Sequence, residues 1–316
     1  MKFIFVILFF ITSLSFATAI TIATVSTTTA ADTATCTASN DGDGIDKVIY
    51  GNDNRLDVYS SKNKKYKRWA VSTAALIPRE NLSKTITGKY YRIKADTLKK
   101  AANVCSSERF ANQITAAQCS GFLVGSDLLL TAGHCIETIS DCDNYYWVFD
   151  YRLHNILPIK CLNNITVKAT SVYTCVEVIG QRSDSEVDYA LVRLNRKVVD
   201  RSPLTYRKSG KIIDNSKIVV IGHPVGLPTK IAAGANVRSN NDDGFFVTNL
   251  DTYGGNSGSA VINSTTGEVE GILVRGEEDF VTAPGKTCMI SNKCANDSCR
   301  GEEVTRITAV EELFTK

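Results

Sequence analysis

This 316-residue sequence has little excess charge and few long apolar runs. Lys and Arg number 36 against 33 Asp and Glu, so the formal net charge is only +3. That balance is too even for a protein dedicated to nucleic acid. The one apolar run that could enter a membrane lies at the extreme N-terminus. With 43% hydrophobic and 22% charged residues, the composition is that of a globular protein and excludes disorder, collagen and coiled coil.

The N-terminal run has the features of a secretory signal. A short basic start at Met1 and Lys2 precedes the almost wholly apolar stretch Phe3–Phe16, and Ala17–Ala19 supplies the small residues that a signal peptidase needs. An uncleaved membrane anchor is the alternative, but the run is shorter than the ~20 apolar residues of a membrane span. We therefore predict a signal peptide over 1–19, a secreted protein (extracellular or periplasmic), and no stable membrane span after signal removal.

Residues 20–47 differ in composition from the remainder of the chain. Thr and Ala dominate Ile20–Ser39, and Asp-Gly-Asp-Gly comes next at 41–44 without an amphipathic period. This composition is typical of a flexible linker or a pro-segment. We expect the folded domain to occupy 48–316.

The body of the chain has the pattern of β structure. Short apolar runs such as Tyr189–Val192 and Lys217–Ile221 alternate with turn residues such as Gly125–Asp127. Many short strands with frequent turns predict an all-β barrel or sandwich. Short helices are predicted over Asp96–Ala102 and Val310–Thr315.

Three motifs carry candidate chemistry: LTAGHC at 130–135, DYALVRL at 188–194 and GGNSGS at 254–259. The first presents an imidazole at a strand end, the second an acid at a strand start, and the third a serine between glycines that permit a tight backbone. Each alone is compatible with a purely structural role. Together, His134, Asp188 and Ser257 supply the base, orienting acid and nucleophile that serine catalysis needs.

The three motifs resemble the signatures of chymotrypsin-fold (trypsin-like) serine proteases. The likeness is closest to the bacterial secreted branch that includes the glutamyl endopeptidases, where Asn commonly precedes the nucleophile, as Asn256 does here. The resemblance implies two antiparallel six-stranded β-barrels, about 66–198 and 199–310, with the active site between them and a C-terminal helix. It also implies a disulfide between Cys119 and Cys135.

Roles for individual residues are implied by the same resemblance. Ser257 would be the nucleophile, His134 the general base, and Asp188 the group that orients the imidazole. The N–H groups of Gly255 and Ser257 would form the oxyanion hole. No cofactor and no metal are required, the partners are protein or peptide substrates, and we expect a monomer.

Other residues depart from the vertebrate pattern. Asn256 cannot form the ion pair that Asp at this position makes with a freed N-terminus, so activation must differ. Val274 stands where many relatives have a Ser that supports the catalytic Asp. The sequence from Val48 looks like the mature start of glutamyl endopeptidase relatives, so we predict a zymogen cleaved after Lys47; the alternative is that only the signal is removed.

The remaining cysteines leave their pairing open. Cys288, Cys294 and Cys299 gather near the C-terminus, where zinc is conceivable by count. Export favours disulfides instead. Cys161 with Cys175 is one candidate pair.

The resemblance places substrate-binding residues at Asp251, Thr252 and Gly276. Asp251 stands where trypsin-like relatives have a carboxylate at the base of the specificity pocket, which predicts cleavage after Arg or Lys through a charge-assisted hydrogen bond. The glutamyl branch has a His where this chain has Leu273. Arg275 is close enough in sequence to neutralise Asp251, and Asp251 could also be a simple turn residue.

We therefore predict a secreted serine endopeptidase that hydrolyses peptide bonds through a Ser-His-Asp triad, after Arg or Lys. One alternative is a catalytically silent pseudoprotease that acts as a secreted binding module, although neither His134 nor Ser257 is replaced. A second is a protease with Glu specificity. A third is an esterase, but α/β-hydrolase esterases carry the triad in the order Ser, Asp, His.

Overall fold

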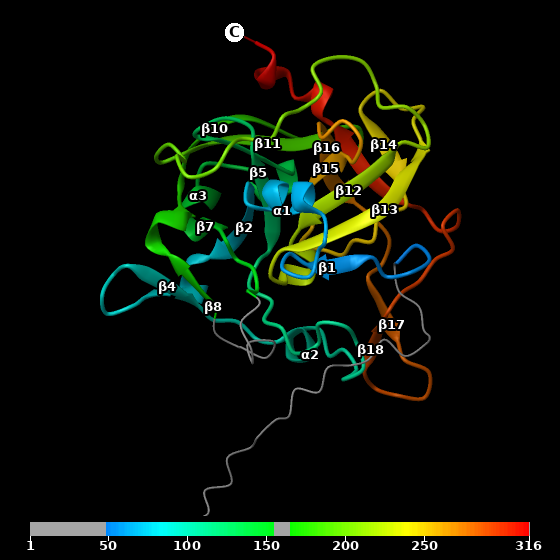
Figure 1. Cartoon of the computed structure of the whole chain (residues 1–316), viewed down its shortest axis with the longest axis horizontal. Coiled ribbons are helices and arrows are strands. Elements are labelled where there is room, and N and C mark those ends of the chain that lie inside the picture. Colours follow the sequence, from blue (N-terminus) through cyan, green and yellow to red (C-terminus); the bar gives the residue numbers. More distant parts are fainter. Residues whose placement is uncertain (1–48, 155–164, 316) are drawn as a thin grey trace, which may run out of the picture. The chain divides into compact units, whose positions relative to one another are not determined.

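The computed structural model describes residues 49–154 and 165–315, all within one compact unit that spans 39–316. The predicted signal peptide, the linker or pro-segment, and the Lys47–Val48 bond lie outside the described residues. Two seven-stranded antiparallel sheets make up most of the fold (Figure 1). Within the described ranges, no helix has the length and apolar character needed to cross a membrane.

The first sheet comes from the N-terminal half of the described chain. Its strands, in spatial order, are β10 (Cys175–Ser183), β11 (Asp188–Leu194), β6 (Leu128–Thr131), β5 (Cys119–Leu123), β2 (Thr73–Pro78), β7 (Tyr145–Phe149) and β9 (Val172–Tyr173). A smaller sheet holds β3 (Leu82–Lys84), β4 (Tyr90–Ile93) and β8 (Ile165–Lys168).

The second sheet closes into a six-stranded barrel because β13 pairs with β14 as well as with β12. Its order is β1 (Arg55–Asp57), β13 (Lys230–Ser239), β12 (Lys217–Gly222), β15 (Ala260–Asn263), β16 (Val269–Arg275), β19 (Glu302–Arg306) and β14 (Phe245–Thr248). β1 lies outside the closed ring and adds to the β13 edge. A separate hairpin joins β17 (Phe280–Thr282) to β18 (Met289–Ser291).

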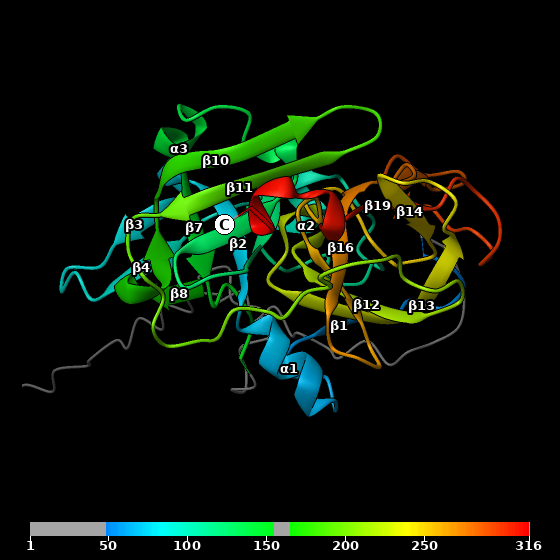
Figure 2. The same cartoon turned by 90° about the horizontal axis from the view of Figure 1, so that it is seen from above.

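Helices are few and short among the described residues. They are α1 (Lys64–Ala70), α2 (Leu98–Ala101) and α3 (Asp141–Asn144), with 3-10 turns at Arg79–Asn81, Gly133–Cys135, Ala169–Ser171, Pro224–Gly226, Ile307–Ala309 and Glu311–Leu313. The predicted helix at 96–102 is present as α2. The predicted C-terminal helix needs correction, because that segment makes 3-10 turns instead (Figure 2).

One apolar core cluster holds the two sheets together. It combines first-sheet residues such as Phe122 and Leu191 with barrel residues such as Ile221 and Ile272, all almost wholly buried. Strands β5 and β11 are buried along nearly their whole length, which explains why most of their residues are apolar. The expected all-β architecture is confirmed, with a closed barrel beside a sheet that is only partly closed.

Candidate active site

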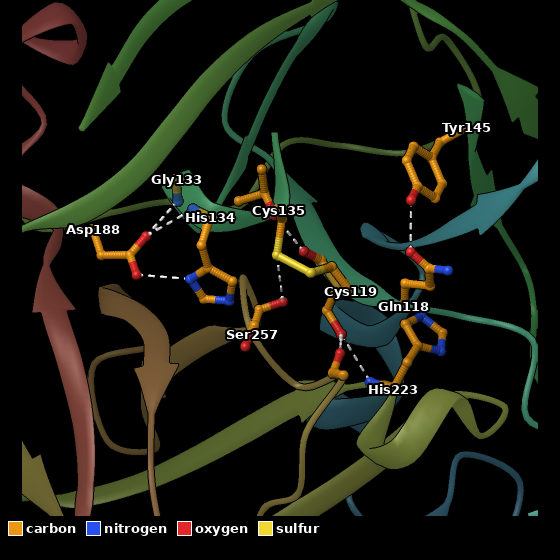
Figure 3. The surroundings of a disulfide bond; sticks show 12 residues. Gln118, Cys119, Gly133, His134, Cys135, Tyr145, Asp188, His223 and Ser257 are labelled. Atoms are coloured by element: carbon orange, nitrogen blue, oxygen red, sulfur yellow. Dashed lines mark hydrogen bonds and ion pairs between the residues drawn. A yellow bond between two sulfur atoms is a disulfide. The ribbon is translucent and has the colours of Figure 1, made fainter. Parts of the chain in front are cut away.

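His134 lies at the end of β6, in the 3-10 turn Gly133–Cys135. A disulfide between Cys135 and Cys119 fastens this turn to β5, as the resemblance implied (Figure 3). Gly133 is required here, since a Cβ on it would lie 1.9 Å from the carbonyl oxygen of Arg182. The His134 side chain keeps 37% of its surface exposed, so its imidazole is accessible from solvent.

Asp188 begins β11 and its side chain is 6% exposed. One carboxylate oxygen accepts the N–H groups of Gly133 at 2.5 Å and His134 at 3.2 Å. The other lies 2.7 Å from Nδ1 of His134. Because a carboxylate only accepts, Nδ1 must donate, which leaves Nε2 to act as a base. The two backbone N–H groups hold the carboxylate although Val274 brings no hydroxyl.

Ser257 lies between two glycines in left-handed conformations, Gly255 with φ +80° and Gly258 with φ +87°. A Cβ at Gly255 would lie 2.8 Å from the His223 carbonyl oxygen, and one at Gly258 would lie 2.0 Å from that of Ser120. Both positions therefore need glycine for conformation and for space.

Ser120 connects the serine loop to the histidine turn, a role that the motifs did not predict. Its N–H donates to the Ser257 carbonyl at 2.8 Å, and its hydroxyl donates to the Gly255 carbonyl at 2.8 Å. Ser120 follows Cys119 on β5, and Cys119 is bonded to Cys135 beside His134. This short path brings the His134 and Ser257 side chains to the same part of the molecule (Figure 3).

The N–H groups of Gly255 and Ser257 donate to no acceptor among the described residues. Their neighbours are engaged, since Asn256 donates to the Tyr253 carbonyl and Gly258 to that of Leu273. Two adjacent unpaired N–H groups beside a serine hydroxyl can bind an oxyanion.

Cys119, His134 and Cys135 place candidate metal-ligand atoms within 4.8 Å of one another. The two sulfur atoms are joined in a disulfide, so they offer no thiolate and this cluster does not fit a metal ion. The other disulfides between described residues join Cys105 to Cys288, Cys142 to Cys175, and Cys294 to Cys299. The pairing of Cys175 with Cys161 is therefore wrong, and the three C-terminal cysteines are not zinc ligands.

Residues 119–272 match the family described as "Trypsin-like peptidase domain". They form a trypsin-like peptidase domain. The match bears out the resemblance of these residues to trypsin-like peptidases. The three motifs lie within these bounds. The remainder of the described chain adds the N-terminal segment, the first strands of the first sheet and the closing strand β19 of the barrel.

A curated relative, "Secreted RxLR effector protein 73" of Plasmopara viticola, is 30% identical over 168 residues, which cover 46% of this chain and 38% of that protein. The chain thus matches less than half the length of this relative. Among solved structures, a Glu endopeptidase shares 14% identity at TM-score 0.49, over 84% of this chain and 96% of that one. The VesB protease of Vibrio cholerae shares 14% identity at TM-score 0.47, over 83% and 67%.

A cavity of about 320 Å³ opens beside Ser257 in this peptidase. Thr252 and Gly276, both expected to contact substrate, line it. Four acidic residues and one basic residue, Arg275, also belong to the lining; the acids are Glu277, Glu278, Asp279 and Glu302. The cavity is therefore acidic, although the chain as a whole carries a net charge of +3.

Asp251 is the sequence-predicted residue that the structure does not bring to this cavity. It is 4% exposed, and its two oxygens accept the N–H groups of Tyr50 at 2.9 Å and Asn54 at 2.8 Å. The expectation that Asp251 forms the base of the cavity needs correction, because its carboxylate already serves the N-terminal segment. Arg275 does not neutralise it either, since it pairs with Glu303 at 2.9 Å.

Glu302, on β19, presents its carboxylate to the cavity instead. It is 3% exposed, accepts the hydroxyl of Thr252, and accepts the N–H of Glu277 at 3.4 Å. Burial raises the pKa of Glu302 to about 8. No motif marked this residue, because it lies in the sequence well beyond the glycines around Ser257.

Asp279 is a further, partly buried carboxyl group in the cavity lining. Its carboxylate accepts the N–H of Gly254 at 2.8 Å, next to the candidate oxyanion donors. Burial raises the pKa of Asp279 to about 6.

Proposed function

We propose that this chain is a secreted serine endopeptidase that cleaves peptide bonds after Arg or Lys. Ser257 is the nucleophile, His134 the general base and acid, and Asp188 the residue that orients and stabilises the imidazolium. The observation that carries the proposal is the 2.7 Å contact of Asp188 with His134 Nδ1, in a site where the Ser257 loop is bonded to the neighbouring strand.

The reaction proceeds in two acyl-transfer steps. His134 Nε2 takes the hydroxyl proton as Ser257 Oγ bonds to the substrate carbonyl carbon. The proton then passes to the departing amine as the C–N bond breaks, which leaves an acyl-enzyme. A water molecule deprotonated by His134 attacks the ester, and the proton returns to Ser257 as the acid product leaves.

The unpaired N–H groups of Gly255 and Ser257 support an oxyanion hole. They are oriented by the loop before substrate arrives, so they need no reorganisation as negative charge develops on the carbonyl oxygen. Each such donor stabilises the transition state by roughly 3 kcal/mol.

The preference for Arg or Lys is supported by Glu302 rather than by Asp251. A buried carboxylate with few hydrogen-bond donors is costly, and a guanidinium or ammonium ion entering the cavity offsets that cost. An acidic side chain would instead meet four nearby carboxyl groups, which argues against Glu specificity.

Secretion is supported by indirect observations. The N-terminal run has signal-like composition, and eight described cysteines form four disulfides, the state that an oxidising compartment favours. The 30% identical relative is itself named as a secreted effector protein.

The test compares purified protein on peptides that differ only in Arg, Lys, Glu or Leu before one bond. We expect cleavage after Arg and Lys, and covalent labelling of Ser257 by a fluorophosphonate. Ser257→Ala is the matched control. Folded protein that neither cleaves nor is labelled would favour the pseudoprotease, and preferred cleavage after Glu would contradict the assigned specificity.

A further inference from the structure

Asp251 is a buried carboxylate that the proposed mechanism leaves without a role. Both of its oxygens accept N–H groups from a segment about 200 residues earlier, at Tyr50 and Asn54. Burial raises its pKa to about 7. Retaining an acid in such a place is costly unless the bonds it makes have a function.

The segment that Asp251 binds, Ile49–Asp57, is docked at both of its ends. Ile49 and Tyr50 are 0% and 3% exposed. Gly51 donates to the Cys294 carbonyl at 3.2 Å, and Cys294 donates to that of Ile49 at 3.3 Å. The segment ends in β1, which pairs with β13 (blue beside yellow in Figure 1).

The same segment also contacts the cavity lining beside Ser257. Arg55 is 1% exposed, and its guanidinium lies 4.1 Å from the ring centroid of Tyr253, a lining residue. Asp53 holds that guanidinium through bonds of 2.9 and 3.0 Å. A buried cation held by a carboxylate over an aromatic face restricts how the ring can move.

The Tyr50 phenol is electrostatically coupled to Glu302, a residue that lines the cavity. Burial and the Glu302 carboxylate raise the pKa of the Tyr50 phenol to about 12. The segment thus contacts one lining residue, Tyr253, and binds Asp251, which directly precedes the lining residue Thr252 in the chain.

We propose that Asp251 is a positioning residue that docks Ile49–Asp57 behind the specificity cavity, and that this docking holds the stretch from Thr252 to Gly254 in the conformation that binds the substrate side chain. The inference rests on the proposed function for its substrate. Docking by Asp251 would connect the N-terminal segment to the active site without the ion pair that Asn256, an uncharged residue, cannot form. It also requires that any maturation cleavage leave Ile49 in place.

The test uses Asp251→Ala and Asp251→Asn in the full chain, assayed on matched Arg and Leu peptides. Each oxygen accepts one N–H, so the Ala variant loses both bonds, whereas the amide oxygen of Asn keeps one. We expect the ratio of kcat/KM for Arg over Leu to fall about tenfold or more in Asp251→Ala, and less in Asp251→Asn.

Glu270→Gln is the matched control. Glu270 is 2% exposed and bonded to Arg207 and Asn263, and it is not among the residues that line the cavity. This variant should lose stability without changing the Arg-to-Leu ratio. If Glu270→Gln and Asp251→Ala changed the Arg-to-Leu ratio of kcat/KM equally, general destabilisation would explain the change. That result would overturn the proposal.

Hydrogen exchange at the Tyr50 and Asn54 amides measures docking directly. Faster exchange in Asp251→Ala, together with a lower Arg-to-Leu ratio of kcat/KM, supports the proposal. Faster exchange with an unchanged ratio overturns it, and so does unchanged exchange. If wild-type protein is neither active nor labelled at Ser257, the proposed function fails separately. Benzamidine, a small amidine, then probes the cavity by calorimetry: weaker binding to Asp251→Ala than to wild type supports positioning, and equal binding or none overturns it.

Discussion

Gly276 lies so close to the Glu302 carboxylate in the cavity lining that no side chain would fit at position 276. A Cβ on Gly276 would lie 2.0 Å from Oε2 of Glu302 and 2.5 Å from its carboxyl carbon. Because Gly276 has no side chain, it leaves the space that the Glu302 carboxylate fills. Gly276 directly follows β16, and Glu302 begins β19, the strand that pairs with β16. An acidic cavity floor at this point depends on both residues together.

Gly276→Ala should selectively impair the cleavage of Arg and Lys peptides. The added methyl group must displace the Glu302 carboxylate, so kcat/KM for these peptides should fall about tenfold or more. Labelling of Ser257 by a small fluorophosphonate should stay near the wild-type rate, because that reagent does not fill the cavity. Full activity on Arg peptides would show that the carboxylate is not used.

Glu302→Gln should abolish a pH dependence that is specific to cationic substrates. With a pKa of about 8, the Glu302 carboxyl becomes increasingly ionised between pH 7 and 9, which strengthens attraction for Arg. The ratio of kcat/KM for Arg over Leu peptides should rise over this range, while the contribution of His134 cancels in the ratio. The Gln variant should show a low and flat ratio. A flat ratio in wild-type enzyme would contradict the assignment.

The sequence predicts those parts of the site that are encoded locally. His134, Asp188 and Ser257 each lie in a short motif whose glycines and apolar residues fix the local backbone, and the structure brings them together. The Cys119–Cys135 disulfide is likewise confirmed. The cavity floor is not predicted, because the resemblance fixes the place of Asp251 in the chain but not the direction of its carboxylate.

The parts that the sequence does not predict depend on distant pairings. Asp251 is bound by Tyr50 and Asn54, and the cavity carboxylate comes from Glu302 on the last strand. The pairing of β1 with β13 likewise joins two segments that are separated in the sequence by all the strands of the first sheet. The predicted C-terminal helix is wrong because so short a segment gains little from helix formation without packing to support it.

Ser257→Ala should abolish peptide cleavage while leaving a folded protein. The Ser257 side chain is only partly buried, so the melting temperature should change by only a few degrees. Turnover should fall by about 10⁶-fold, because removing the nucleophile removes the whole covalent pathway. Substantial turnover by the purified variant would contradict the role of Ser257.

Asp188→Asn should reduce kcat by about 10⁴-fold, since the amide favours the wrong imidazole tautomer. Asp188 also accepts the N–H groups of Gly133 and His134, so the variant should lose stability as well. Kinetics at saturating peptide and a thermal melt measure the two effects. A loss of stability with kcat intact would assign Asp188 a structural role only.

Stability should fall as pH rises from about 6.5 to 8. Burial raises the pKa values of Asp251 to about 7 and Glu302 to about 8, above the ~4 of unfolded carboxyls. The folded state therefore holds protons that the unfolded chain has lost, and the free energy of unfolding decreases with pH in this window.

His223 works in the opposite direction, but only at lower pH. Burial lowers its pKa to about 3, so the unfolded chain binds the extra proton, and the His223 contribution to stability increases with pH up to about 6.5, the ordinary histidine pKa. Above that value His223 no longer opposes the buried carboxyls, and Glu302 alone contributes a decline of about 1.4 kcal/mol per pH unit. Denaturant unfolding at half-unit steps from pH 6.5 to 9 should show this decline, flattening above pH 8. In Glu302→Gln, only the smaller decline of the free energy of unfolding that is due to Asp251 should remain. An unchanged slope in that variant would show that Glu302 is already ionised at neutral pH.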